Sequence, residues 1–194
     1  MNYFVDEWER VTAWHFIPDD AEDCPAILCL HGRHPAGKDE PAGITGDPHL
    51  ALAQRLAELG YATFAPDCTT AGQRVLSSRV PYDSSTWYDE HPRGCLLGKM
   101  IIDHMRAVDA LVECPAVDGE RIGVIGHGFG GANALLLAAS DERIRATAAS
   151  CGFVPFNRDA HIDRWFDADG LVLAPKLKAA AAKGSYAFDW EDIL

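Results

Sequence analysis

The 194-residue sequence, with 48% hydrophobic and 24% charged residues, has the composition of a single globular domain with a sizeable core over residues 1–194. Its net charge of −12, from 17 basic and 29 acidic residues, disfavours nucleic-acid and anionic-membrane partners, which attract clustered Lys and Arg. No apolar run has the length of a membrane span, and the N-terminus has no signal-peptide core, so we expect a cytoplasmic location.

Short apolar runs of strand length alternate with helical segments along the chain. This alternation predicts a parallel sheet with right-handed crossovers. The expected strands are residues 11–17, with 3–8 as a candidate to pair with them, 25–30, 61–65, 121–125 and 144–150. The expected helices are residues 47–60, 96–112, 132–139 and 175–183, with the start of another at 189–194. Residues 68–93 are expected to be irregular, and a loop of that length often carries function.

The chain is organised around residues 121–139, where an apolar strand is followed by a Gly-rich corner and an apolar helix. Strand, sharp turn and buried helix form the frame of a nucleophile elbow, G-x-S-x-G. The first and last residues of this pattern must be small, because the strand and the helix approach each other closely there. In this sequence they are Gly126 and Gly130. The middle position should carry the nucleophile, and here it is Gly128, which has no hydroxyl.

Four segments resemble the α/β-hydrolase superfamily, and within it the dienelactone hydrolase and acetyl xylan esterase-like group. Residues 26–38 resemble the strand and His-Gly loop of an oxyanion hole, and residues 60–67 resemble the strand that follows. Residues 98–121 resemble the helix and turn leading into the elbow, and residues 121–152 resemble the elbow, its helix and the next strand. The resemblance implies a three-layer fold with a mostly parallel sheet and helices on both faces. It also implies acyl transfer through an elbow serine as the family mechanism.

The resemblance places an oxyanion hole beside the nucleophile position. Backbone N–H groups near Arg33, after the corner formed by His31 and Gly32, and the N–H of Phe129 would point at a developing oxyanion. The same corner could also be only a tight turn at the end of the strand, with no functional role. His127 fits the elbow pattern as a residue that packs and orients, so it is not assigned as a nucleophile.

Four further residues are candidates for a cleft. Arg74 resembles a family arginine that braces the loop after a strand, although Gln73 stands where we expect an acidic partner. Trp87 could line a substrate cleft or anchor the long loop that contains it. Asp159 and His161 could form a substitute acid and base, or belong to a polar loop.

The C-terminal part departs from the family pattern. The fold orders its triad as nucleophile, acid and histidine, and the last two follow later strands. No clear strand follows residues 144–150, and His161 is the sole histidine after Gly128. We therefore expect a domain that is incomplete at its C-terminus. We also expect residues 153–194, or a second chain such as a symmetry mate, to shield the edge at 144–150.

Three functional hypotheses remain open from the sequence. The first is an esterase-like protein that is inactive as this chain because Gly128 replaces the nucleophile. The second is a carboxylic-ester hydrolase seen as a fragment or as a nucleophile mutant. The third is a binding or interaction module that retains the cleft for a small ester-like ligand. No cofactor is expected, and no metal site is predicted, since no Cys or carboxylate completes the spacing of His31 and His34.

Overall fold

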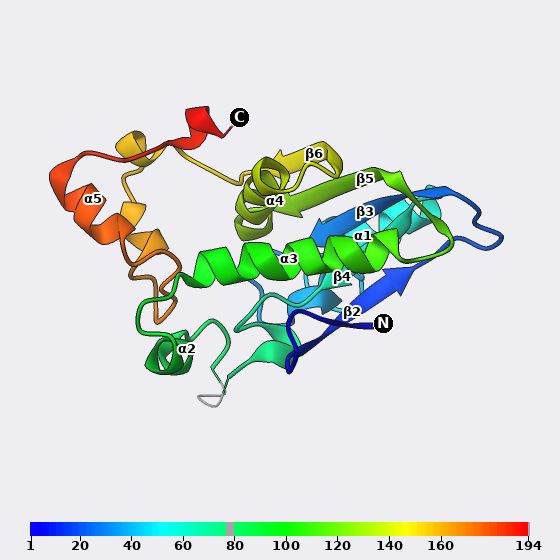
Figure 1. Ribbon diagram of the computed structural model, residues 1–194, viewed down its shortest axis with the longest axis horizontal. Helices are drawn as coiled ribbons and strands as arrows, with labels where there is room; N and C mark the ends of the chain where they lie inside the picture. Colours follow the sequence, from blue (N-terminus) through cyan, green and yellow to red (C-terminus); the bar gives the residue numbers. More distant parts are fainter. Residues whose placement is uncertain (77–79, 194) are drawn as a thin grey trace.

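The computed structural model describes residues 1–76 and 80–193 and places a six-stranded sheet between layers of helices (Figure 1). The strand order is β1-β2-β4-β3-β5-β6, in which β3 to β6 run parallel and β1 and β2 are antiparallel additions. The strands are β1 (Asn2–Phe4), β2 (Arg10–Phe16), β3 (Cys24–Leu30), β4 (Ala62–Pro66), β5 (Val117–His127) and β6 (Ile144–Ser150). The α-helices are α1 (Leu52–Glu58), α2 (Ser85–Glu90), α3 (Leu96–Val112), α4 (Phe129–Ser140) and α5 (Leu177–Lys183). This is the predicted three-layer, mostly parallel architecture.

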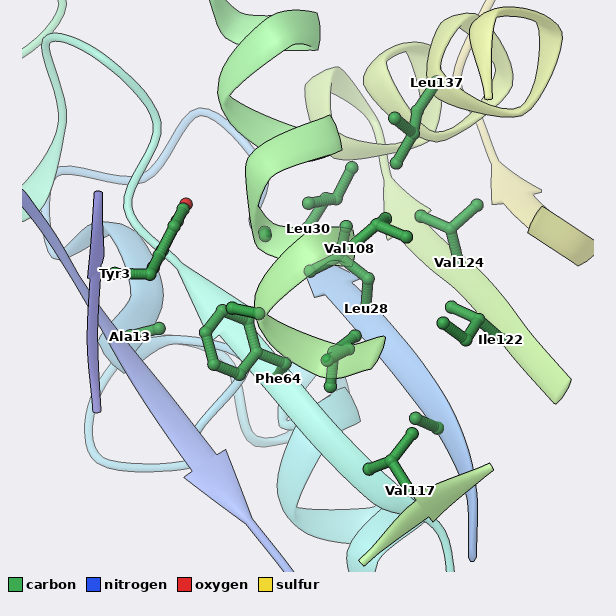
Figure 2. Close-up of a cluster of buried hydrophobic side chains, with 14 of the residues drawn as sticks. Tyr3, Ala13, Leu28, Leu30, Phe64, Val108, Val117, Ile122, Val124 and Leu137 are labelled. Atoms are coloured by element: carbon green, nitrogen blue, oxygen red, sulfur yellow. The ribbon is translucent and has the colours of Figure 1, made fainter. Parts of the chain in front are cut away.

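The main core lies between one face of the sheet and helices α3 and α4, and α1 covers part of the other face. Figure 2 shows Leu28, Phe64 and Val124 of the sheet meeting Val108 of α3 and Leu137 of α4. On the opposite face, buried strand residues pack on α1 in a smaller cluster. The continuous apolar run of β3 is consistent with this cover on both faces, as predicted.

Some helix and strand boundaries differ from the predicted ones because of the local backbone conformation or strand pairing. The helix expected at 47–60 is divided into a 3₁₀ helix, Pro48–Leu50, and α1, because Ala51 adopts φ −69° and ψ 55° between them. Asp47 caps the first part, as expected, by accepting the N–H of His49 at 2.8 Å. Strand β5 begins at 117 and not at 121, because its first residue already pairs with β3 across a register shift.

The segment 68–93 is less irregular than predicted. It contains α2 and a 3₁₀ helix, Gly72–Arg74, while residues 77–79 lie outside the described part. Beyond β6, the helix expected at 175–183 forms as α5, and the one expected at 189–194 is a 3₁₀ helix, Trp190–Asp192. Within the two described ranges, no helix is both long and apolar enough to cross a membrane.

The prediction that residues 153–194 would shield the edge of β6 is wrong for the described residues. Strand β6 stands at the end of the strand order, and most of its side chains are exposed. The segment after it instead packs at the carboxyl end of the sheet, where Phe156, Trp165 and Trp190 join a second apolar cluster. A hydrogen bond from the N–H of Leu97 to the carbonyl of Leu173, at 3.0 Å, fixes this segment to α3. Coverage of the edge by a second chain remains a prediction.

Candidate functional site

The turn between β5 and α4 has the backbone shape of an elbow. Gly128 is the residue before the first turn of α4, and it adopts φ 55° and ψ −117°. Its N–H donates to the carbonyl of Ser150 at 2.7 Å, and its carbonyl accepts the N–H of Ala132 at 3.1 Å. L-residues rarely adopt this conformation, which glycine tolerates. A Cβ added at Gly128 would find no atom within 4 Å, so the space above the turn is open.

The two flanking glycines are required by close backbone packing. A Cβ on Gly126 would overlap the backbone of Gly130. A Cβ on Gly130 would overlap the carbonyl oxygen of Leu30 at the end of β3. Since backbone atoms cannot rotate away as a side chain can, neither position accepts a larger residue without moving α4. The predicted close approach of strand and helix is therefore present.

His31 braces the loop after β3. Its Nε2 accepts the N–H of Cys68 at 3.0 Å, so the proton resides on Nδ1, which donates to the carbonyl of Gly32 at 2.7 Å. Its side chain is almost wholly buried, and this burial lowers the pKa of His31. With both ring nitrogens engaged in this way, the residue is a structural support and not a free base.

Tyr82 connects the same loop to the elbow helix. Its hydroxyl lies 3.0 Å from the carbonyl oxygen of Gly32 and 2.8 Å from that of His34, and its single proton is shared between these two acceptors. Its ring packs edge-on against Phe129, with centroids 6.4 Å apart, and the guanidinium of Arg33 lies 5.6 Å from its centroid. Burial raises the pKa of Tyr82, so the hydroxyl keeps its proton. Sequence reasoning missed this residue because it lies in the loop expected to be irregular.

A cavity of about 210 Å³ lies directly over the elbow. Its floor is formed by Gly128 and the first turn of α4, and Arg33 stands at its side. The opposite wall comes from the segment after β6. The residues of that wall are Cys151, Gly152, Phe153, Val154, Arg164, Trp165, Leu171 and Leu173. This wall was not predicted, because its residues follow no periodic pattern in the sequence.

Arg74 and Trp87 do not line this cavity. Arg74 is buried, pairs with Glu9 and with Asp103 at 2.7 Å, and donates to the carbonyl of Asp67. These contacts brace the loop after β4, and the two carboxylates stand in for the acidic residue that was expected at 73. Trp87 stacks on His91 with centroids 4.7 Å apart and is buried, so it anchors α2. The contacts of Trp87 fit the alternative in which it anchors the long loop.

The remaining candidates are also separate from the cavity wall. The carboxylate of Asp159 pairs with Arg164 at 2.5 Å and accepts the N–H of His161 at 2.9 Å, as in a polar loop. His127 lies with its Nδ1 3.1 Å from the hydroxyl oxygen of Ser150 on the adjacent strand. Over residues 1–76 and 80–193, no group of three His, Cys, Asp or Glu side chains is arranged to hold a metal ion.

Comparisons with known proteins agree with this geometry. A sequence model of the dienelactone hydrolase family matches residues 11–168, well over half of the chain. YtaP of Bacillus subtilis (strain 168), which carries a provisional hydrolase name, is 32% identical over 154 residues, covering 75% of this chain and 50% of YtaP. The chain therefore spans about half the length of that curated relative.

Solved structures share the fold at low sequence identity. A Bacteroides fragilis NCTC 9343 protein, provisionally assigned as an acetyl xylan esterase, has a TM-score of 0.67 at 24% identity, over 75% of this chain and 42% of that one. Est1E from Butyrivibrio proteoclasticus, solved with ferulic acid bound, has a TM-score of 0.60 at 22% identity, over 91% of this chain and 61% of Est1E. At these identities the likeness extends to the fold alone.

The backbone packing at the elbow predicts a specific sensitivity to added methyl groups. Gly130→Ala should lower the free energy of unfolding by about 3 kcal/mol, because the new Cβ would overlap a carbonyl oxygen of β3. Gly98→Ala is the matched control. That residue is helical and its added Cβ would be 3.8 Å from the nearest atom, so stability should rise by up to about 1 kcal/mol. Urea denaturation of both variants measures the difference, and equal effects would contradict the packing described.

Proposed function

Because this chain belongs to the dienelactone hydrolase family, we propose that it retains an esterase-like acyl-binding site and lacks the elbow nucleophile of a hydrolase. The observation that carries the proposal is Gly128. In this proposal Gly128 takes the nucleophile position; its φ of 55° and ψ of −117° and the open space where a side chain would stand support that assignment. The protein would then bind an ester-like or acid ligand without forming an acyl-enzyme at this position.

In this proposal the oxyanion-binding part of the site consists of backbone N–H groups, so it needs no side chain at 128. The N–H of Phe129 is at the start of α4, where the helix dipole favours negative charge, and the backbone near Arg33 supplies the second donor in this proposal. Tyr82 supports this arrangement by joining the loop after β3 to Phe129. The ferulic acid bound to the structural relative Est1E is consistent with a small aromatic acid or ester as the ligand class.

The cavity also offers no base for serine chemistry. Its lining residues include no histidine, aspartate or glutamate among those the structure describes. His31 has both ring nitrogens in hydrogen bonds, and His161 lies in the loop held by Asp159. A hydroxyl without a neighbouring base is a weak nucleophile at neutral pH, so restoring the serine would not restore the mechanism.

A second candidate is a carboxylic-ester hydrolase formed by a longer protein, in which Gly128 is a substitution of the nucleophile. The observation that favours it is coverage, since the chain spans half of YtaP. The coding sequence beyond residue 194 separates the two candidates. An open frame that supplies an aspartate and then a histidine favours the hydrolase, and a stop codon favours the binding protein.

The first functional prediction is the absence of ester turnover. The purified chain should release p-nitrophenol from p-nitrophenyl acetate no faster than a heat-denatured sample, because Gly128 supplies no nucleophile. It should also fail to react with a fluorophosphonate probe, read by intact mass. An adduct mapped to any serine would refute the proposal.

The second functional prediction concerns repair. Gly128→Ser alone should give no burst of product, and it should cost about 1–3 kcal/mol of stability because φ at this position is positive. Gly60→Ser is the matched control for strain, since Gly60 also has positive φ and open surroundings but lies outside the cavity lining. Stopped-flow measurements with an aryl ester decide the matter. Burst kinetics in Gly128→Ser would mean that a base exists in this chain, with His161 as the first residue to test.

A further inference from the structure

We propose that the free edge of β6 and the adjoining side of α4 form one surface that pairs with the same surface of a second copy of this chain. In the pair, the two β6 strands run antiparallel about a two-fold axis at Ala148, and the two α4 helices pack beside each other. The residues of this surface are Leu135, Ala138 and 146–149. None of them lines the cavity over Gly128, so the inference does not rest on the proposed function.

The second half of β6 is an unprotected strand edge. Strand β6 ends the order of the described strands, and Ala146, Thr147 and Ala148 are exposed (Figure 1). Natural proteins usually blunt such edges with charges, prolines or bulges. The register shift and the one charge of β6, Arg145, lie at its beginning, whereas residues 146–150 have no charge, no proline and a regular register. This half of the strand can therefore accept another strand.

The backbone groups along this edge are self-complementary. The carbonyl of Ser150 faces β5, because it accepts the N–H of Gly128 at 2.7 Å. Backbone groups alternate in direction along a strand, so those of Ala148 also face β5, and those of Thr147 and Ala149 point away from the sheet. In an antiparallel pair centred on Ala148, Thr147 of each copy faces Ala149 of the other. All the outward groups of these two residues are then satisfied.

The side chains favour the same register. Ala148 faces its own counterpart, and Ala146 faces Ser150 of the other copy, at positions where the Cα atoms of the two strands lie about 4.5 Å apart. These side chains are small enough to avoid crowding at that distance. A pair centred on Arg145 would instead place two like charges opposite each other, which is destabilising.

Helix α4 extends this surface beside the edge. Its sequence contains no charged residue, and a helix that is apolar all round is normally covered on every side. Gly131 marks the side that faces β6, since its added Cβ would lie 3.0 Å from Gly152. Leu135 and Ala138 follow on the same side of the helix and are only half-buried. This side of α4 therefore lacks part of its expected cover.

A two-fold axis at Ala148 supplies that cover. Helix α4 packs over β5 and β6, so its axis lies about 4.8 Å from the boundary between the two copies, one strand spacing away. The two α4 helices are then about 10 Å apart, which is the interaxial distance of packed helices. Leu135 and Ala138 of the two copies meet between them.

The charge of this segment also favours a second copy at this place. The chain has 29 acidic residues and a net charge of −12, so two copies repel each other over most of their surfaces. Residues 143–158 contain no Asp or Glu. The arginines beside the edge, Arg143 and Arg145, are paired with Asp141 and Glu120 at 2.6 and 3.0 Å. The edge is therefore locally neutral, and the repulsion that remains is long-range and screened by salt.

Light scattering on the purified full chain is the first test. It should give the mass of two 21.1 kDa chains, and the dimer should strengthen as salt screens the net charge. Ala148→Lys places two like charges at the axis and should give a monomer under the same conditions. Ala179→Lys, which changes an exposed alanine of α5 away from β6 (Figure 1), is the matched control and should remain dimeric.

A disulfide tests the register. Ala148→Cys should form an interchain disulfide with its own counterpart under mild oxidation, because Cα atoms about 4.5 Å apart lie within the range of a disulfide. Ala146→Cys lies on the same face of the strand but faces Ser150, so it should cross-link at least about tenfold more slowly. Peptide mapping assigns the bond, since Cys95 and Cys151 are also exposed.

Three results would overturn the inference. They are a single-chain mass across the salt range, a dimer that survives Ala148→Lys, and equal cross-linking of the two cysteine variants. A single-chain mass is also the result expected if another segment or another protein occupies the edge of β6. None of the three bears on ester turnover, so the proposed function is tested separately.

Discussion

The backbone of α4 touches the backbone of β3 at Gly130, and the carboxyl end of the sheet is arranged around that contact. With no side chain between them, the first turn of the helix lies against the carbonyl of Leu30. A similar contact between Gly131 and Gly152 sets the exit of β6 beside the same turn. The helix start, the end of β3 and the end of β6 therefore converge, and Gly128 is the half-buried residue at their centre.

Buried polar contacts hold the loops around this centre. Asp67, at the end of β4, pairs with the Lys38 ammonium at 2.6 Å and accepts the backbone N–H groups of Lys38 and Gln73 at 2.8 and 3.0 Å. Both charged side chains are almost wholly buried, so removal of either one would leave an unpaired charge and cost about 3–5 kcal/mol. Together with the contact between His31 and Cys68, this pair ties the loop after β3 to the loop after β4. None of these contacts involves residue 128, so they do not depend on which side chain stands there.

The parts of the fold that could be predicted from sequence are those with a local pattern. The apolar runs of β3 and β4 and the amphipathic pattern of α3 marked these elements, and the spacing of Gly126 and Gly130 marked the elbow. The cavity wall from 151 to 173 could not be found, because tertiary contacts such as that between Leu97 and Leu173 position it, without a periodic pattern. Tyr82 was missed for the same reason, since its role depends on where its loop folds. The segment after β6 does not cover the edge of that strand, contrary to the expectation. Its apolar side chains pack instead into the second apolar cluster at the carboxyl end of the sheet.

We propose that glycine at 128 preserves the shape of the elbow and removes its chemistry. The backbone of Gly128 in a high-resolution crystal structure of the purified chain measures this most directly. The account predicts a positive φ near 55°, a hydrogen bond from its N–H to the carbonyl of Ser150, and open space above the turn. A relaxed turn with negative φ, in which α4 has moved off β3 and closed the cavity, would contradict it.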